Sequence, residues 1–503
     1  MTGPAATFNI MGCCCSRNVF NVCEGESLSV EGYIQRQNPL LVLQKPHAIL
    51  DDDMLWDFVK YLAQRDQNLA LQFCHGFNRR MLRMLVNCEA VDALLNRKGE
   101  YLLIDTYYFQ GDKIHILDVD GEKTMMAGGY ARILPRLKKS GLLPEDAEIY
   151  KLEACPNYVL LADRFCEFVR DNWGDKVVLL NSMPCGYMYD SDLGIREMDF
   201  KEDAEQSEFI FELLREKLGC HCVTLPETLI SRDGDPVHYV DPITDYIKHS
   251  LDCIVLGRGS GEIENAKQEC SEAMRRMKRG EIYDEQTAWI WFKRQSKSSD
   301  ADIARVKTVL DKLIAQGSAI GWMGYSSLYR TGNGVGLDLK ESERCAKIAS
   351  GIDAKRSISE LFNILWAENT PESLKELKEA LDSLEPIDNA RTLKLRFRLY
   401  SSHRISFDKK IAKDCLRRAV ELDRSTLSDY VNYLWKIGDN EDAFLACRRY
   451  SEDFKDGDAM LRLSYMLSEG IGTEKDSDES SRILEEFKAI YPGRDADFGQ
   501  FKS

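Results

Sequence analysis

The sequence predicts an α/β domain with a parallel sheet in a three-layer arrangement, followed by an all-α solenoid of helical repeats. The chain has 503 residues, more than the roughly 250 to 300 residues that one hydrophobic core supports, so at least two domains are expected. In the first half, short apolar runs alternate with amphipathic helical stretches, which is typical of a parallel sheet covered by helices. In the second half almost every stretch has helical spacing, and one pattern occurs twice.

The strands of the α/β domain are expected at five short apolar runs. These lie at residues 8–11, 101–104, 113–119, 176–180 and 220–225. Helices with apolar side chains at i, i+3 and i+4 are expected at residues 55–62, 81–85, 158–168 and 210–214. We place this domain at residues 1–256.

A glycine-rich segment follows the α/β domain. Gly257, Gly259 and Gly261 interrupt regular structure. The segment lacks the strand-to-helix context and the following acidic residue that a dinucleotide-binding loop requires. We therefore interpret residues 257–280 as a linker and place the helical repeats at residues 281–503.

The repeated pattern consists of an alanine, a tyrosine, two glycines separated by one residue, and an aspartate. The two copies are Ala319, Tyr325, Gly332, Gly334 and Asp338, and Ala459, Tyr465, Gly470, Gly472 and Asp476. The glycines allow a tight turn between two antiparallel helices, and the alanine permits their close approach. This pattern resembles the Sel-one-like repeat, a relative of the tetratricopeptide repeat. The resemblance implies a solenoid whose concave surface binds a protein partner.

Composition excludes several classes of partner. The formal net charge of −16 repels phosphate backbones and anionic lipids, so we expect no nucleic acid and no membrane insertion. The first residues lack the basic region of a signal peptide, and no stretch approaches the roughly 20 apolar residues of a membrane span. The 16 cysteines are spread along a long chain, which indicates reduced thiols. A cytoplasmic location is expected.

The segment after the first predicted strand has the clearest pattern for chemistry. The strand at residues 8–11 runs into Gly12 and Cys13, which places a small nucleophile at the carboxyl edge of the sheet. Backbone N–H groups at the start of the next helix would stabilise a developing oxyanion. Cys13 as a small buried thiol remains an open alternative. Ser16 is a second nucleophile candidate or a cap of the helix.

A loop near the end of the domain supplies a candidate general base. In Asp235-x-x-His238, the three-residue offset lets the carboxylate reach the imidazole Nδ1–H while Nε2 faces the nucleophile. Asn181 directly follows the strand at residues 176–180, so its amide is a candidate oxyanion donor beside Gly12.

These blocks resemble an SGNH-type (GDSL-like) ester hydrolase domain, of a glycine-serine-cysteine family found in bacterial polysaccharide loci. Members of that family read glycine-serine-cysteine, one variable residue, then serine-arginine-aspartate. Gly12, Cys14, Ser16 and Arg17 match this first block. The resemblance covers about the first half of the chain, and it implies that Ser16 and Arg17 belong to the substrate-binding part of the site.

The chain departs from the family pattern at three places. Cys13 stands where the family has its nucleophilic serine, and Asn18 stands where it has aspartate. After the strand that ends in Asp105, Tyr107 and Tyr108 replace an acidic-arginine pair. These replacements favour a site that has lost its activity.

No cofactor and no metal ion is expected. The clusters Cys13-Cys14-Cys15 and Cys220-His221-Cys222 lack the two-residue gap of structural zinc sites. Adjacent side chains of a strand also point to opposite faces.

Two functions follow from these patterns. The resemblance implies an esterase or O-acyltransferase with a variant triad of Cys13, His238 and Asp235. Its ester substrate would be an acylated surface polysaccharide or a precursor of one. The alternative is a catalytically degenerate SGNH-fold binding or scaffold protein whose helical repeats recruit a protein partner. A Cys13 sulfur within hydrogen-bond reach of His238 would favour the enzyme.

Overall fold

The structure, a computed structural model, forms two compact units. The first comprises Met1–Met54 and Arg80–Ala301, and the second comprises Leu55–Arg79 and Asp302–Ser503. The structure describes residues 6–21, 28–35, 37–96, 98–107, 114–127, 129–152, 158–233, 235, 237–298, 302–385, 387, 389–402, 404, 407–491, 494 and 498–501.

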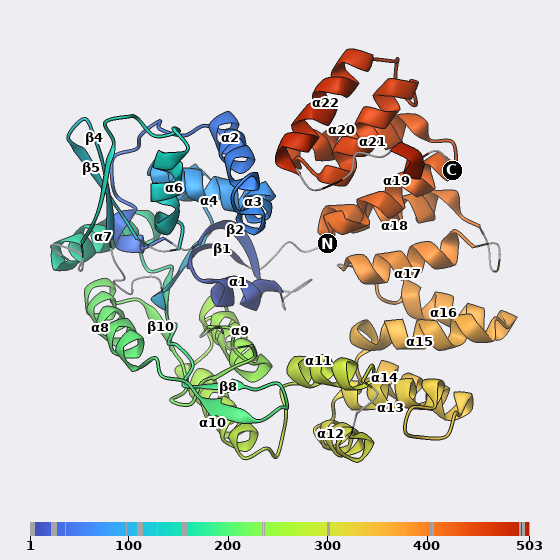
Figure 1. Cartoon of the computed structure of the whole chain (residues 1–503). Helices are drawn as coiled ribbons and strands as arrows, with labels where there is room; N and C mark the ends of the chain where they lie inside the picture. Colours follow the sequence, from blue (N-terminus) through green and yellow to red (C-terminus); the bar gives the residue numbers. More distant parts are fainter. Residues whose placement is uncertain are drawn as a thin grey trace. The chain divides into compact units, whose positions relative to one another are not determined.

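A five-stranded parallel sheet is the centre of the first unit (Figure 1). Its order is β10-β7-β3-β1-β2, and every neighbouring pair runs parallel. The order reverses between β1 and β3, which makes the sheet doubly wound. The strands are β1 (Ala6–Gly12), β2 (Leu28–Gln35), β3 (Tyr101–Asp105), β7 (Val177–Asn181) and β10 (His221–Thr224).

Hydrophobic burial explains which strands the sequence pattern identified. In β7 every residue is buried, and β1 and β3 are almost as fully covered, so their sequences are nearly continuous apolar runs. The edge strand β2 was not predicted, because it is half-buried and carries Ser29, Glu31 and Gly32 among its apolar residues.

Helices cover both faces of the sheet, which confirms the predicted three layers. Right-handed crossovers in opposite directions from β1 and from β3 place the connecting helices on opposite faces. Accordingly, α1 packs against α9, and α7 packs against α8. The bounds of the helices in or bordering this unit are α1 (Cys14–Asn21), α4 (Gly76–Val86), α5 (Ala90–Asn96), α6 (Leu134–Lys139), α7 (Tyr158–Trp173), α8 (Lys201–Leu218) and α9 (Asp241–Val255).

The strand predicted at residues 113–119 does not join the parallel sheet. Its observed counterpart β4 (Ile114–Val119) lies in a separate antiparallel sheet with β5 (Glu122–Met126) and β6 (Glu148–Leu152). The reason is the two-residue turn Asp120-Gly121, in which both residues have positive φ and reverse the chain into a hairpin. A third small sheet contains β8 (Tyr187–Tyr189), β9 (Ile195–Glu197) and β11 (Ile230–Ser231).

The segment that we interpreted as a linker contains a helix of the first unit. Helix α10 (Ser260–Lys278) buries Cys270, Met274 and Met277 and packs against α9. Only a short turn at Gly257, with φ of 63°, separates the two helices. Helix α11 (Glu285–Gln295) also belongs to the first unit, so the division between the units falls in the sequence between Ala301 and Asp302 rather than at residues 257–280.

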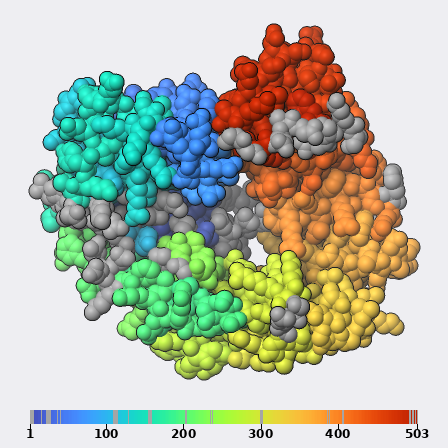
Figure 2. All heavy atoms as spheres, viewed as in Figure 1, coloured from blue at the N-terminus to red at the C-terminus, as the bar shows by residue number. Residues whose placement is uncertain are grey.

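The second unit is a run of helices along the chain, α12 to α22 (Figures 1 and 2). Consecutive helices pack against each other, and side chains fill the spaces between neighbouring ribbons. The helices are α12 (Ile303–Ala315), α13 (Ala319–Thr331), α14 (Leu339–Ile352), α15 (Ala354–Glu368), α16 (Pro371–Asp382), α17 (Ala390–Tyr400), α18 (Lys409–Leu422), α19 (Leu427–Lys436), α20 (Asn440–Phe454), α21 (Gly457–Glu469) and α22 (Ser477–Ile490).

The two glycine turns predicted from the repeats have the same geometry. Gly332 and Gly470 end α13 and α21 in the left-handed region, with φ of 70° and 73°. The side chains of Asp338 and Asp476 cap the helices that follow by accepting backbone N–H hydrogen bonds. Both turns therefore connect equivalent helix pairs.

A buried serine pair joins the helices of each of these two pairs. The Ser342 hydroxyl donates to the Ser326 carbonyl at 2.8 Å, and the Ser480 hydroxyl donates to the Ser464 carbonyl at 2.7 Å. In each pair the serines are 16 residues apart. The serines and the turns set the register of the two copies.

The predicted tyrosines do not occupy equivalent positions in the two copies. Counting back from Gly332 and Gly470 pairs Ser326 with Ser464, so Tyr325 does not align with Tyr465. The prediction that these two tyrosines are equivalent is therefore wrong.

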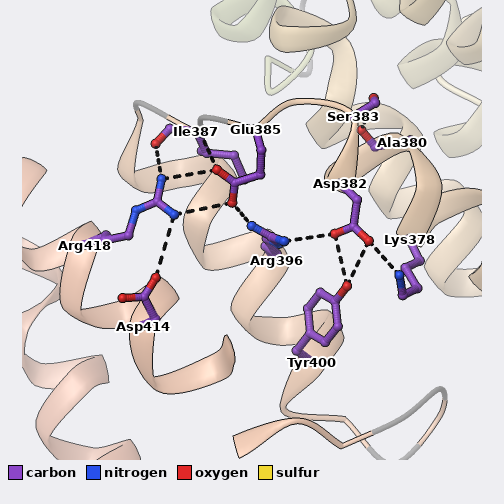
Figure 3. A network of polar contacts seen from close by, with 10 residues as sticks. All are labelled: Lys378, Ala380, Asp382, Ser383, Glu385, Ile387, Arg396, Tyr400, Asp414 and Arg418. Carbon is purple, nitrogen blue, oxygen red and sulfur yellow. Dashed lines mark hydrogen bonds and ion pairs between the residues drawn. The ribbon is translucent and has the colours of Figure 1, made fainter. Parts of the chain in front are cut away.

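A polar network lies around α16, α17 and α18 (Figure 3). Asp382 accepts a hydrogen bond from the Tyr400 hydroxyl at 3.0 Å, and it forms ion pairs with Arg396 at 3.1 Å and Lys378 at 2.6 Å. Arg396 also contacts the carboxylate of Glu385. Asp408 caps α18 in the way that Asp338 caps α14, so the helix pair α17–α18 shares this feature of the repeat.

An early segment of the chain belongs to the second unit. Residues Leu55–Arg79, which include most of α2 (Asp52–Ala63) and all of α3 (Gln67–Cys74), group with the helical repeats. The Lys455 ammonium lies 5.9 Å from the centre of the Trp56 ring, and the Cys74 and Tyr491 side chains share a hydrogen bond. The segment lies within residues 1–256, which the sequence pattern places in the α/β domain.

Candidate functional site

The candidate site lies where the order of the parallel sheet reverses. In open α/β sheets, ligands bind beyond the carboxyl ends of the strands at such a point. Here β1 ends at Gly12 and β3 ends at Asp105, on neighbouring strands. Added to Gly12, a Cβ atom would lie 2.1 Å from Asp105 Oδ2, so only glycine leaves room for this carboxylate.

Asp105 accepts hydrogen bonds from the first turn after β1. The Cys13 backbone N–H donates to Asp105 Oδ2 at 2.6 Å, and the Ser16 hydroxyl donates to the same oxygen. The Cys13 side chain also hydrogen-bonds this carboxyl, and the Tyr107 N–H donates to Oδ1 at 3.2 Å. Burial raises the pKa of Asp105, and these hydrogen bonds oppose the rise only in part.

Cys13, Ser16 and Arg17 therefore lie at the predicted place, at the end of the first strand. Cys13 and Ser16 are fully buried, and Arg17 on α1 is half-buried. Ser16 contacts Asp105 instead of serving as a free hydroxyl at the helix start. Cys13 and Ser16 thus meet on one buried acid.

Asn181 ends β7, the neighbour of β3. It is 7% exposed, and its Oδ1 atom is buried without a hydrogen-bond partner among the residues that the structure describes. The adjacent Thr106 N–H donates to the Leu180 carbonyl at 3.2 Å, which holds the ends of β3 and β7 together. Because an unpartnered buried amide is costly, Asn181 is a candidate ligand-binding group.

His238 lies between two carboxylates. Its Nδ1 atom is 3.0 Å from Asp233 Oδ2, and its Nε2 atom is 3.7 Å from Asp235 Oδ2. The sequence predicted that Asp235 contacts Nδ1. In the structure Asp233 makes this contact, because the loop turns the carboxylate of Asp235 toward Nε2. The backbone of this loop is fixed by the His238 N–H, which donates to the Asp235 carbonyl at 3.1 Å.

The His238 loop reaches the end of β7. The Tyr239 hydroxyl donates to the Met183 carbonyl at 2.6 Å, two residues after Asn181. Helix α9 follows this loop and packs against α1, which follows Cys13. The fold thus brings the predicted segments to the same edge of the sheet. A contact between Cys13 and His238 stays a prediction.

Two site residues were missed. Asp105 ends a strand in the sequence, and Asp233 precedes Asp235 in the same acidic loop, so both had a detectable signal. What the sequence lacked was the side-chain direction. The arrangement offers a buried acid, a histidine between two carboxylates and, among the described residues, an amide oxygen without a hydrogen-bond partner.

All cysteines whose side chains the structure describes are free thiols. Among the described residues, no helix is both long enough and apolar enough to cross a lipid bilayer.

Fold and site together define a protein with a doubly wound α/β domain and a C-terminal array of helical repeats. No family model and no curated protein matches the sequence. Several solved structures are similar to it, among them the following two. A Sel1 repeat protein from Oxalobacter formigenes is 18% identical, with a TM-score of 0.30, over 40% of this chain and 83% of that one. A protective antigen of uropathogenic Escherichia coli that displays an SLR fold is 13% identical, with a TM-score of 0.30, over 65% of this chain and 61% of that one.

Similarity at this level carries no argument about function. The repeat architecture rests instead on the matching turns, caps and serine pairs of the chain itself.

Proposed function

We propose that this chain is a binding and scaffold protein, whose α/β domain of the SGNH-like type has lost acyl-transfer activity and whose helical repeats recruit a protein partner. The observation that carries the proposal is the buried Asp105, which accepts hydrogen bonds from the Cys13 N–H and the Ser16 hydroxyl.

Acyl transfer at this position would require those same groups. An oxyanion hole needs N–H donors that point at the substrate oxygen. At the end of β1, the Cys13 N–H is already 2.6 Å from a carboxylate oxygen. A substrate oxygen would have to displace it and leave a fully buried acid with fewer partners, at a cost of at least about 2 kcal/mol.

An esterase assay tests the loss of activity. The protein is incubated with p-nitrophenyl acetate beside Cys13→Ala and His238→Ala. We expect the same residual rate from all three, because no acyl-enzyme forms. A rate that falls in both variants would overturn the proposal and support the triad.

Cross-linking in cells tests the role of the repeats. Solenoids present a continuous surface that is suited to protein ligands. Cross-links to another protein should concentrate on residues 302–503. If they fall on the α/β domain instead, the repeats are not the recruiting surface.

A second candidate function is an esterase or O-acyltransferase that acts on an acylated glycan. The pairing of His238 with Asp233 favours it. In this mechanism Cys13 would attack the ester carbonyl while His238 accepts the thiol proton and passes it to the alcohol that leaves as the C–O bond breaks. Water or another hydroxyl, deprotonated by His238, would then attack the Cys13 thioester and release the acyl group, with the thiol reformed.

Covalent probes distinguish the two functions. A thiol-reactive and a serine-reactive acyl probe are each applied to the protein, to Cys13→Ala and to His238→Ala. The second function predicts labelling at Cys13 that requires His238. The scaffold function predicts no labelling at Cys13 beyond that of other buried thiols.

A further inference from the structure

We propose that the first unit binds a zinc ion through His249, Cys253 and Glu262, where the end of α9 lies beside the start of α10. The three side chains present one imidazole nitrogen, one sulfur and one carboxylate oxygen, all within 4.8 Å of one another. This site is separate from the residues at the sheet edge, and it does not depend on the proposed function.

The helix geometry brings the ligands together. His249 and Cys253 are four residues apart on α9, so they lie on one face of that helix. Glu262 lies in the first turn of α10, which packs against α9. The short turn between the two helices brings this carboxylate next to the Cys253 side chain.

The two distances from the Cys253 sulfur fit a tetrahedral zinc site. The Cys253 sulfur is 3.4 Å from His249 Nε2 and 3.8 Å from Glu262 Oε2. Metal–ligand bonds of about 2.0 to 2.3 Å arranged as a tetrahedron separate the ligand atoms by about 3.3 to 3.8 Å. The side chains therefore need little movement to enclose an ion.

The ligand types select zinc. A thiolate and an imidazole bind Zn²⁺ well, whereas Ca²⁺ and Mg²⁺ prefer oxygen ligands. A bound Zn²⁺ stabilises a thiolate beside a carboxylate, because its charge offsets their two negative charges.

Three protein ligands leave the fourth position open. A pocket of about 590 Å³ adjoins the cluster, and His249 and Glu262 line it. Its wall also carries Asp245 and Glu269, so the local charge is negative and attracts a divalent cation. Zinc sites with three protein ligands and an open position bind water or a small molecule there.

Arg258 is the competing partner of Glu262, at 3.7 Å from its Oε2 atom. Both side chains of this pair are about half exposed, and exposed ion pairs contribute about 0 to 1 kcal/mol. Zinc coordination outweighs such a contact. The arginine can keep a contact with the other carboxylate oxygen.

Metal titration of the full chain tests the site. Chelator-treated protein is titrated with Zn²⁺ by calorimetry and with Co²⁺ by absorption spectroscopy, which reports a cobalt–thiolate bond. We expect Cys253→Ser to remove the cobalt–thiolate band. His249→Gln and Glu262→Gln should weaken Zn²⁺ binding by at least about 10-fold.

Cys270→Ser is the matched control, because Cys270 lines the same pocket but is not part of the cluster. Its titration should match that of the wild type. Because the Glu262 side chain is about half exposed, Glu262→Gln should leave the fold intact, and circular dichroism of the variant checks this. Absence of Zn²⁺ binding, or equal affinity in the wild type and all three ligand variants, would overturn the proposal.

Discussion

At the end of β1, the missing side chain of Gly12 makes room for the carboxyl of Asp105. The acid in turn accepts hydrogen bonds from the Cys13 N–H and the Ser16 hydroxyl. Because Gly12 leaves this space, the buried acid engages both the Cys13 N–H and the Ser16 hydroxyl in hydrogen bonds.

Gly12→Ala should destabilise the protein by about 2 kcal/mol, because the added methyl group overlaps Asp105 and disturbs its hydrogen bonds. Urea unfolding measures the change. Gly186→Ala is the matched control, since a Cβ atom there has nothing within 4 Å, and its stability should remain close to the wild type. Equal effects of both variants would contradict the packing argument.

Asp105 also predicts a pH dependence. Its pKa is raised in the folded protein, so the folded state keeps its proton to higher pH than the unfolded chain does. As pH rises from the ordinary carboxyl pKa to the raised value, this group therefore lowers the free energy of unfolding. Asn at this position cannot titrate, so Asp105→Asn should gain stability relative to the wild type across that window.

Urea unfolding from about pH 4 to pH 8 measures this difference. The non-titrating Gly186→Ala variant should differ from the wild type by a constant amount over the same range. A constant difference for Asp105→Asn as well would show that Asp105 titrates alike in both states.

At the scale of elements, the helix pairs share an aspartate cap at the start of their second helix but differ in what joins the two helices. Pairs α13–α14 and α21–α22 use buried serines. The region of α16, α17 and α18 uses the network around Arg396, whose side chain is 14% exposed (Figure 3). One repeat geometry therefore tolerates either neutral or ionic contacts in its interior.

Arg396→Ala should lower the free energy of unfolding by about 2 kcal/mol, because Asp382 and Glu385 lose a partly buried charged donor. Chemical denaturation of the full chain measures this loss. Lys378→Ala is the control, because its ion pair with Asp382 is more exposed, and it should cost about 0.5 kcal/mol. A larger effect for Lys378 than for Arg396 would contradict the assigned roles.

Asp382 gives the network an acid-sensitive part. Burial alone would raise the pKa of Asp382, but hydrogen bonds from Lys378 and Tyr400 lower it overall. A lowered pKa contributes stability above the ordinary carboxyl value, and this stability is lost as pH falls through the lowered pKa.

At the scale of the whole molecule, the chain crosses between its two compact units three times. It enters the second unit at Leu55, leaves it at Arg79 and returns at Asp302. The helices of Leu55–Arg79 contact residues near the end of the repeats through Trp56 with Lys455 and Cys74 with Tyr491. This segment is therefore part of the repeat unit.

Hydrogen exchange tests this membership. Phe487→Leu, in the buried interior of α22, should cost about 1 kcal/mol and raise amide exchange in Leu55–Arg79 about fivefold. Val178→Ala in β7 is the control and should affect the parallel sheet instead. If residues 55–79 follow the sheet in both variants, they belong energetically to the first unit.

Much of the fold was predictable from local pattern. Buried central strands such as β7 are continuous apolar runs. Gly332 and Gly470 predict turns, because they end helices in a left-handed conformation that glycine adopts easily. The place of Cys13 at a strand end was likewise local. The edge strand β2 was not predicted, because polar residues interrupt its apolar pattern. The helix α10 was not predicted, because glycines at its start indicated a linker.

By itself the sequence determined the parallel sheet, the helical repeats and the segments that form the sheet-edge site, because spacing along the chain encodes which face of an element is buried. Only the tertiary structure decided which side chains meet. It paired Asp105 with Cys13, turned Asp233 to His238 Nδ1 and placed Glu262 beside Cys253. Such contacts depend on how separate elements pack, and periodicity within one element carries no information about that packing.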